Sequence, residues 1–216
     1  MLRFSRNDDR QGDVGRSMIE MLGVLAIIGV LSVGGIAGYS KAMGTYKLNR
    51  YREGLAELLS NFLQVKEQLT YEKGDRTTNY SQILSAMNML PAEFKLTGND
   101  LRDEFGNGLQ IYHDNRHAYE NHYGFSFTLR KNKKTSLVCQ ALIETAKSFQ
   151  NDISEMYRYS ATGANTPYYT AYGNKHCSKG TKCISDLTVS DIKEMCNFYN
   201  GEDNDIIFWV QIIFKS

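Results

Sequence analysis

An apolar run from Met18 to Gly38 constrains this chain more than any other feature. The run has about the 20 residues that a helix needs to cross the hydrocarbon layer of a bilayer, and its single charged side chain is Glu20, close to its start. On insertion scales an acidic residue at a helix centre costs about 2.5 to 3.5 kcal/mol, so an ionisable group inside such a run indicates a functional site. The sequence therefore predicts a membrane helix in which Glu20 needs a partner of opposite charge.

The composition fits one ordinary soluble domain joined to such a helix. The chain has 216 residues and a formal net charge of +1, which gives enough length for a domain and no general case for nucleic acid or acidic lipid as a partner. Its four cysteines, an even number, are typical of a disulfide framework in an oxidising compartment. If they pair, the polar body lies across the membrane from the cytosol.

The residues at the start of the run carry a resemblance to a known family. Gly15, the segment Ser-Met-Ile-Glu at 17–20 and the unbroken apolar run together resemble the processing site and membrane helix of type IV pilins. In that family a prepilin peptidase cuts after the glycine and methylates the new N-terminus, and a glutamate five residues into the mature chain aids assembly. The resemblance implies cleavage between Gly15 and Arg16, N-methylation of Arg16 and an assembly role for Glu20. The family usually begins its mature chain with Phe or Met, where this chain has Arg16.

Two features of the run bear on assembly. A buried carboxylate is tolerated beside an opposite charge, which the α-amino group of a neighbouring subunit would supply to Glu20. The alternative is an ordinary membrane anchor whose Glu20 extends to the headgroups. The glycines Gly29, Gly34 and Gly38 are the expected helix-packing positions, because small residues let helices approach closely in lipid. The pair Gly34-Gly35 is also a candidate soft point in the helix, since glycine weakens a helix by about 1 kcal/mol relative to alanine.

Apolar residues recur after the run at alternating spacings of three and four, which is typical of a helix with one buried stripe. Lys73-Gly74 is a helix stop signal. We expect one nearly continuous helix from about Met18 to Lys73, about 80 Å long, whose second half packs on a sheet. A free coiled coil is the competing interpretation. The stripe consists of Leu48, Tyr51, Leu55, Leu58, Phe62, Val65 and Leu69.

The rest of the chain is expected to combine short helices with an antiparallel sheet. Residues 75–108 are interpreted mainly as a connection, with a short helix capped by Asn79 and ended by Pro91. The tyrosine-rich segment 157–176 is interpreted as a surface loop, with an exposed adhesive or packing surface as the alternative. The other expected elements are strands at 109–112 and 123–130, a helix at 136–153, a helix at 188–198 with Ser190 as a candidate cap, and a central strand at 206–214.

Four cysteines allow three pairings. Cys177 and Cys183 flank a small loop and can meet at low cost, which leaves Cys139 with Cys196. In the chain-entropy model the longer closure contributes about 4 kcal/mol. The resemblance agrees with this pairing, because type IVb pilins staple their C-terminal region through a cysteine near this helix and one near the chain end. The competing interpretation is a metal site of His176, Cys177, Cys183 and Cys196, which lacks the CxxC pair of the usual zinc patterns.

The sequence contains no nucleophile motif, phosphate-binding glycine loop or metalloprotease signature. We therefore expect no enzyme, no metal and no cofactor. The acidic residues Glu202, Asp203 and Asp205 lack the loop pattern of a known calcium site. His113 and His117 flank a turn and are expected on the surface.

The layout resembles the type IV pilin fold over most of the chain, and is closest to the type IVb group. The expected fold class is α+β, with a long N-terminal helix packed on an antiparallel sheet and a disulfide-bounded C-terminal region. The expected parts are a leader peptide (1–15), a transmembrane and assembly helix (16–40), the amphipathic half of the helix (41–74) and a globular head (75–216).

The resemblance implies a structural subunit of a type IV pilus-like extracellular fibre. The expected partners are further copies of the chain in a helical homopolymer, the prepilin peptidase, the pilus assembly platform and the inner membrane, with no nucleic acid. The expected location is the inner membrane as a single-pass precursor, then an extracellular pilus or a periplasmic pseudopilus. Two alternatives stay open: a pseudopilin of a type II-like secretion system, and a membrane-anchored binding module that does not polymerise.

Overall fold

The computed structural model describes residues 11–69, 79–114, 122–130, 134–160, 169–196 and 206–213. The side chains of residues 11–17, 114, 122, 159–160 and 206–213 lie outside this description. The chain consists of two compact units, Met1–Lys47 and Leu48–Ser216. The fold class of the described residues is α+β, with a long apolar N-terminal helix and an antiparallel sheet, as expected.

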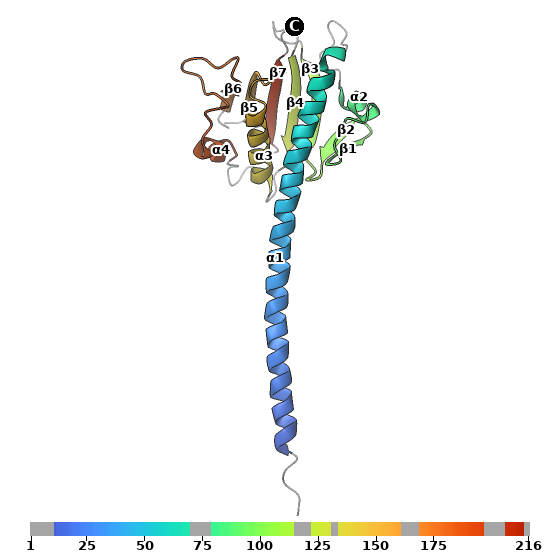
Figure 1. The fold of residues 1–216 in the computed structure, drawn as a ribbon, viewed down its shortest axis with the longest axis vertical. Helices are drawn as coiled ribbons and strands as arrows, with labels where there is room; N and C mark the ends of the chain where they lie inside the picture. Colours follow the sequence, from blue (N-terminus) through green and yellow to red (C-terminus); the bar gives the residue numbers. More distant parts are fainter. Residues whose placement is uncertain are drawn as a thin grey trace, which may run out of the picture. The chain divides into compact units, whose positions relative to one another are not determined.

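The described strands form one antiparallel sheet in the order β1-β2-β3-β4-β7-β5-β6 (Figure 1). The last strand in sequence, β7, pairs with β4 on one side and with β5 on the other, so the prediction of a central strand here is confirmed. The strands are β1 (Phe94–Thr97), β2 (Asp100–Asp103), β3 (Gly108–Asp114), β4 (His122–Leu129), β5 (Glu155–Ser160), β6 (Tyr169–Tyr172) and β7 (Ile206–Ile213).

The long helix ends earlier than the sequence suggested. Helix α1 spans Gln11–Val65 and continues as a short 3-10 turn, Lys66–Gln68. Leu69 is already extended, and the Tyr123 hydroxyl on β4 lies 3.4 Å from the carbonyl oxygens of Lys66 and Leu69. This tertiary contact supplies a polar partner to carbonyls that a helix end leaves free. The prediction that the helix continues to Lys73 was therefore wrong. Lys73 and Gly74 lie outside the described residues, and the boundary at 74 stays a prediction.

Two stretches that were expected to be irregular contain strands. The connection predicted at 75–108 holds the hairpin β1–β2, which turns at Gly98 with a positive φ of 62°. The segment predicted as a surface loop holds most of β5 and all of β6, which pair along 155–158 and 169–172. Strands β1, β2 and β6 have only four residues each, and β5 does not alternate strictly between apolar and polar residues, so their sequences are weak predictors of a strand.

The remaining helices are close to their predicted positions. Helix α2 spans Ser81–Ala86 with Tyr80 at its N-cap position, so the prediction of Asn79 as the cap and of Pro91 as the end was wrong. The Asn79 side-chain oxygen accepts a hydrogen bond of 2.9 Å from the Ser81 backbone N–H just before the helix. Helix α3 spans Thr135–Ser148, shorter at its end than the predicted 136–153. Helix α4 spans Val189–Met195.

The core of the second unit lies between the helices and one face of the sheet. The C-terminal part of α1 and helix α3 lie over the same face in Figure 1, and their side chains meet β4 around Leu55, Phe127 and Leu142. Phe62 packs edge-to-face on Tyr123 and Phe125, with ring centroids 5.2 and 5.0 Å apart. The prediction of a buried stripe on this helix is confirmed: Leu48 and Leu69 are partly buried, and the other five residues are buried, namely Tyr51, Leu55, Leu58, Phe62 and Val65.

The turn between β2 and β3 is ordered by the buried carboxylate of Asp103. Asp103 accepts hydrogen bonds from the backbone N–H groups of Phe105 (2.9 Å) and Asn107 (2.8 Å) and from the Asn107 side-chain amide (2.8 Å), and Phe105 packs edge-to-face on Tyr51 of α1 with ring centroids 5.3 Å apart. Burial raises the pKa of Asp103, and these hydrogen bonds oppose that rise. Burial is also the main cause that raises the pKa of Tyr51, followed by the charge of Asp103.

Replacement of Phe62 by alanine tests the packing of α1 on the sheet. The fully buried ring contacts two aromatic side chains, so F62A should lower the free energy of unfolding by about 3 to 5 kcal/mol. The exposed Gln64 on the same helix provides the control, because Q64A should change it by less than about 0.5 kcal/mol. Urea unfolding followed by circular dichroism measures both; equal losses in the two variants would contradict this packing.

Candidate functional site: the apolar helix and the disulfide region

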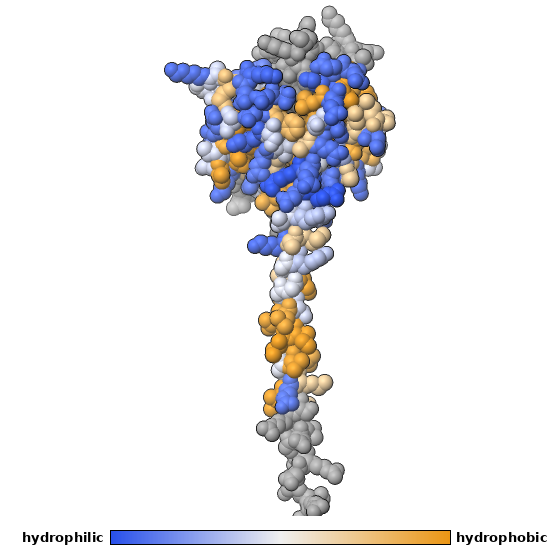
Figure 2. Space-filling model, in the orientation of Figure 1, coloured by the Kyte–Doolittle hydropathy of each residue, from blue (hydrophilic) through white to orange (hydrophobic). Residues whose placement is uncertain are grey.

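The first unit presents an apolar surface on all sides of α1. Every large apolar side chain between Met18 and Ile36 is more than half exposed, from 52% at Ile28 to 73% at Val30. Figure 2 shows one face of this segment, on which apolar residues predominate. A helix that is apolar all round is normally buried in lipid or in protein, and a soluble monomer rarely exposes so long an apolar patch. Among the described helices, α1 is the one that is long and apolar enough to cross a membrane.

Glu20 lies at the start of this apolar surface. Its side chain is exposed, and the ion pairs among the described side chains do not include it. The backbone of Gly15 and Arg16 is part of α1, whereas the Arg16 side chain and residues 1–10 of the expected leader lie outside the described part of the chain. Glu20 is thus surrounded on α1 by exposed apolar side chains, and any apolar environment that covers them would also cover its carboxylate.

The glycines of the run pack against none of the described residues outside their own helix. A Cβ atom added at Gly29, Gly34 or Gly38 would meet nothing within 4 Å. Gly34 and Gly38 are four residues apart and share one helix face, and α1 continues through Gly34 and Gly35 without interruption. The open space over these glycines is free for another helix.

The cysteines of the second unit form two disulfides. Cys139 on α3 is joined to Cys196 at the end of α4, with Cα atoms 5.7 Å apart, and both residues are buried. Cys177 is joined to Cys183 in the loop after β6, with Cα atoms 5.5 Å apart, and both are half-buried. These are the pairs expected from the sequence. Among the described residues no group of His, Cys, Asp or Glu side chains could hold a metal ion.

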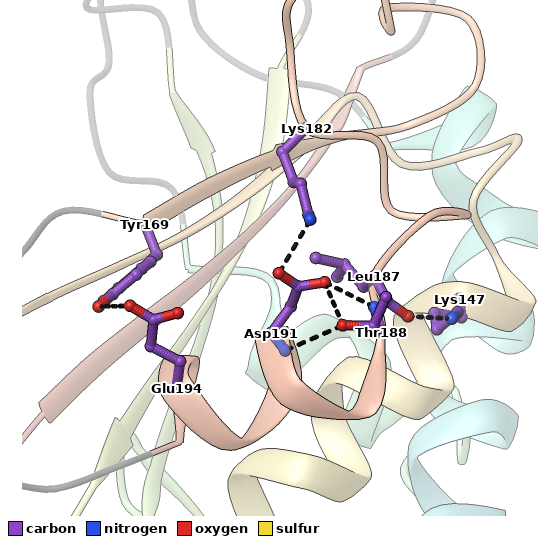
Figure 3. A network of polar contacts seen from close by, with 7 residues as sticks. All are labelled: Lys147, Tyr169, Lys182, Leu187, Thr188, Asp191 and Glu194. Atoms are coloured by element: carbon purple, nitrogen blue, oxygen red, sulfur yellow. Dashed lines mark hydrogen bonds and ion pairs between the residues drawn. The ribbon is translucent and has the colours of Figure 1, made fainter.

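A polar network holds the segment between the disulfides (Figure 3). Thr188 and Asp191 form a reciprocal capping box at the start of α4, so the prediction of Ser190 as the cap was wrong. The Lys182 ammonium lies 2.8 Å from an Asp191 oxygen. Hydrogen bonds from Lys182 and Thr188 hold the pKa of Asp191 well below its usual range.

Two further contacts in Figure 3 join this segment to its neighbours. The Lys147 ammonium on α3 donates to the Leu187 carbonyl at 2.7 Å. The Tyr169 hydroxyl on β6 donates to a Glu194 oxygen at 2.8 Å. Helix α4, although short, is therefore connected to α3 by a disulfide and to β6 by a side-chain hydrogen bond.

Two buried polar residues were not anticipated by the sequence. Arg158 on β5 is 1% exposed, and its guanidinium donates to the Met195 carbonyl at 2.8 Å, next to the disulfide at Cys196. His113 is fully buried and packs edge-to-face on Tyr123, 5.2 Å between ring centroids. The prediction of a surface His113 was wrong, because its place in β3 faces the helix side of the sheet. His117 lies outside the described residues.

Comparisons of the chain with protein-family models, with curated proteins and with solved structures find no match. The described residues define an α+β protein with one N-terminal helix capable of spanning a membrane and with a disulfide-bonded C-terminal region.

Removal of each disulfide in turn should have unequal effects on stability. The Cys139–Cys196 bond closes a sequence separation of 57 residues and the Cys177–Cys183 bond one of 6. In the chain-entropy model, the C139S/C196S variant should lose about 4 kcal/mol of unfolding free energy and C177S/C183S about 2 kcal/mol. Urea unfolding of the two variants under identical conditions measures the difference. A larger loss in C177S/C183S would contradict the structural role assigned to the buried bond.

Proposed function

We propose that this chain is a structural subunit of a type IV pilus-like fibre. It enters the inner membrane as a single-pass precursor, is cut by a prepilin peptidase between Gly15 and Arg16, and polymerises through its N-terminal helix. The observation that carries the proposal is the combination of an uncovered apolar helix surface with one carboxylate at its start. Such a surface must be shielded from water both before and after assembly. Lipid would shield it in the precursor, and copies of the same helix would shield it in the fibre.

Transfer from lipid to a helix bundle requires close contacts between helices, because lipid tails are as apolar as the helix surface itself. The glycines Gly34 and Gly38 favour such contacts, since both leave open space on one helix face. Gly29, at a different angle on the same helix, offers a second place of close approach. Packing, rather than removal of apolar surface from water, is then the attraction between neighbouring helices.

A charge pair gives the assembly its register. Cleavage after Gly15 would create an α-amino group at Arg16, whose N-methylated form keeps its positive charge. The Glu20 carboxylate of an adjoining copy lies near the same depth in a bundle of parallel helices, where it could pair with that group. In an apolar surrounding an unpaired carboxylate is costly, so the bundle is favoured only when the two charges meet.

The second unit supports the same proposal by its order of elements. A helix packed on an antiparallel sheet is followed by a C-terminal region closed by the Cys139–Cys196 bond, which is similar to the order in the type IVb group. The Cys139–Cys196 bond would keep the C-terminal region folded outside the cell. A pseudopilin would share the N-terminal helix but would build only a short periplasmic structure, so electron micrographs of long surface fibres separate the two.

Replacement of Glu20 tests the proposed charge pairing. E20A removes the carboxylate without shortening the apolar run, so the chain should enter the membrane as before while the polymer yield falls at least about tenfold, the equivalent of 1.4 kcal/mol. The control is E67Q, because Glu67 is exposed and lies outside the apolar run. Membrane fractionation and sedimentation of sheared fibres measure insertion and assembly separately. Normal fibres from E20A would refute the pairing.

A further inference from the structure

Two carboxylates on α1 lie on a groove and have no ionic partner among the described side chains. Glu53 and Glu57 are exposed, four residues apart, and make no ion pair within the described part of the chain. Like charges at this spacing destabilise a helix slightly. Both residues line a groove of about 430 Å³ between α1 and the connection from α2 to β1.

The groove has fixed walls. At one end the Arg50 guanidinium donates to Glu93 at 2.8 Å, and at the other the Asn61 side chain donates to the Met89 carbonyl at 3.0 Å. Gly54 leaves the space in which the Glu93 side chain crosses α1, because a Cβ atom there would lie 2.7 Å from a Glu93 oxygen. Arg50 and Glu93 neutralise each other, so the groove keeps the two negative charges of Glu53 and Glu57.

The loop closed by Cys177 and Cys183, together with the residues just before it, carries the opposite charge. Lys175 and Lys179 are exposed and make no ion pair among the described residues, whereas Lys182 pairs with Asp191.

The loop is also held in one shape. The disulfide closes it, and the Thr181 hydroxyl donates to the Ser178 carbonyl at 2.7 Å while the Ser178 N–H donates to that hydroxyl at 2.9 Å. Gly180 turns the chain with a φ of 93°. A loop ordered before binding loses little conformational entropy when it binds.

The groove and the loop lie at opposite edges of one sheet. The groove is bordered by the connection into β1, the first strand in the sheet order, and the loop follows β6, the last. The loop is joined to that edge by a hydrogen bond of 2.8 Å from the Tyr172 N–H to the Lys182 carbonyl. Figure 1 shows β1 and β6 on opposite sides of the sheet. The two surfaces therefore lie at opposite edges of one unit and are available to two different neighbours.

We propose that the Cys177–Cys183 loop of one copy docks in the Glu53–Glu57 groove of the next copy, with Lys175 and Lys179 paired to the two carboxylates. Complementary surfaces at opposite ends of a subunit give a head-to-tail contact, which forms rings when it closes and helical filaments when it does not. The inference rests on the proposed fibre function and names a contact between the second units of neighbouring subunits, in addition to the contact between their apolar helices.

Charge reversal on each side, and then on both, tests this contact. E53K/E57K and K175E/K179E each put like charges together, so the subunit concentration needed for polymer should rise about 3- to 30-fold in low salt, the range expected for two exposed ion pairs. The four-fold variant restores opposite charges and should assemble within about twofold of the wild type. Added salt should weaken wild-type polymer. The matched controls D152K and K95E change exposed charges elsewhere in the second unit and should leave assembly unchanged.

Cross-linking identifies the partners without substitution. Polymer assembled from a mixture of isotopically light and heavy chains is treated with a carbodiimide, which joins a carboxylate directly to a lysine amine. Peptides that join Glu53 or Glu57 of one isotope to Lys175 or Lys179 of the other are the expected result. Polymer that lacks these links and whose reversal variants assemble normally overturns the docking contact and leaves the fibre function standing. A wild-type chain that forms no polymer overturns both.

Discussion

The apolar surface of residues 18–36 is the constraint on which the rest of the molecule depends. Each Å² of apolar surface left in water costs about 25 cal/mol, and every large apolar side chain in this segment is more than half exposed. The chain must therefore keep this helix in lipid or against other helices at every stage. In the proposed fibre the single carboxylate of Glu20 would make the two surroundings unequal, because a cation of a neighbouring copy would stabilise it there, whereas the ion pairs among the described side chains do not include it.

The C-terminal region of the second unit is held in place by covalent and polar contacts. The core of this unit is a sheet covered by helices. Helix α4, Val189–Met195, has only 7 residues, which is too short for a helix to be stable alone. The Cys139–Cys196 bond, the capping box at Thr188 and the Tyr169–Glu194 hydrogen bond hold that helix in place. The smaller loop at Cys177–Cys183 adds little to the core and presents lysines at the edge of the sheet, where they are free to meet a partner.

Sequence periodicity predicted the parts of the fold that are governed by apolar burial. The stripe on α1, the strands β3 and β4 and the central position of β7 all follow from such patterns. Features set by tertiary polar contacts could not be predicted. The end of α1 depends on the Tyr123 hydroxyl, and the burial of Arg158 depends on the Met195 carbonyl. Strands β1, β2 and β6 have only four residues each, too few for a pattern to predict them. At the candidate site, the sequence singled out Glu20 and the glycines, but the groove at Glu53 arises only because the connection from α2 to β1 lies beside α1.

The most direct test of the account is the intact mass of the subunit in purified fibres. The account predicts a chain that begins at Arg16, carries one methyl group on its α-amine and retains two disulfides. The trimmed amine would then be present at the depth where Glu20 requires a cation. A subunit that keeps residues 1–15 and is recovered from membranes only as a monomer would contradict the central claim.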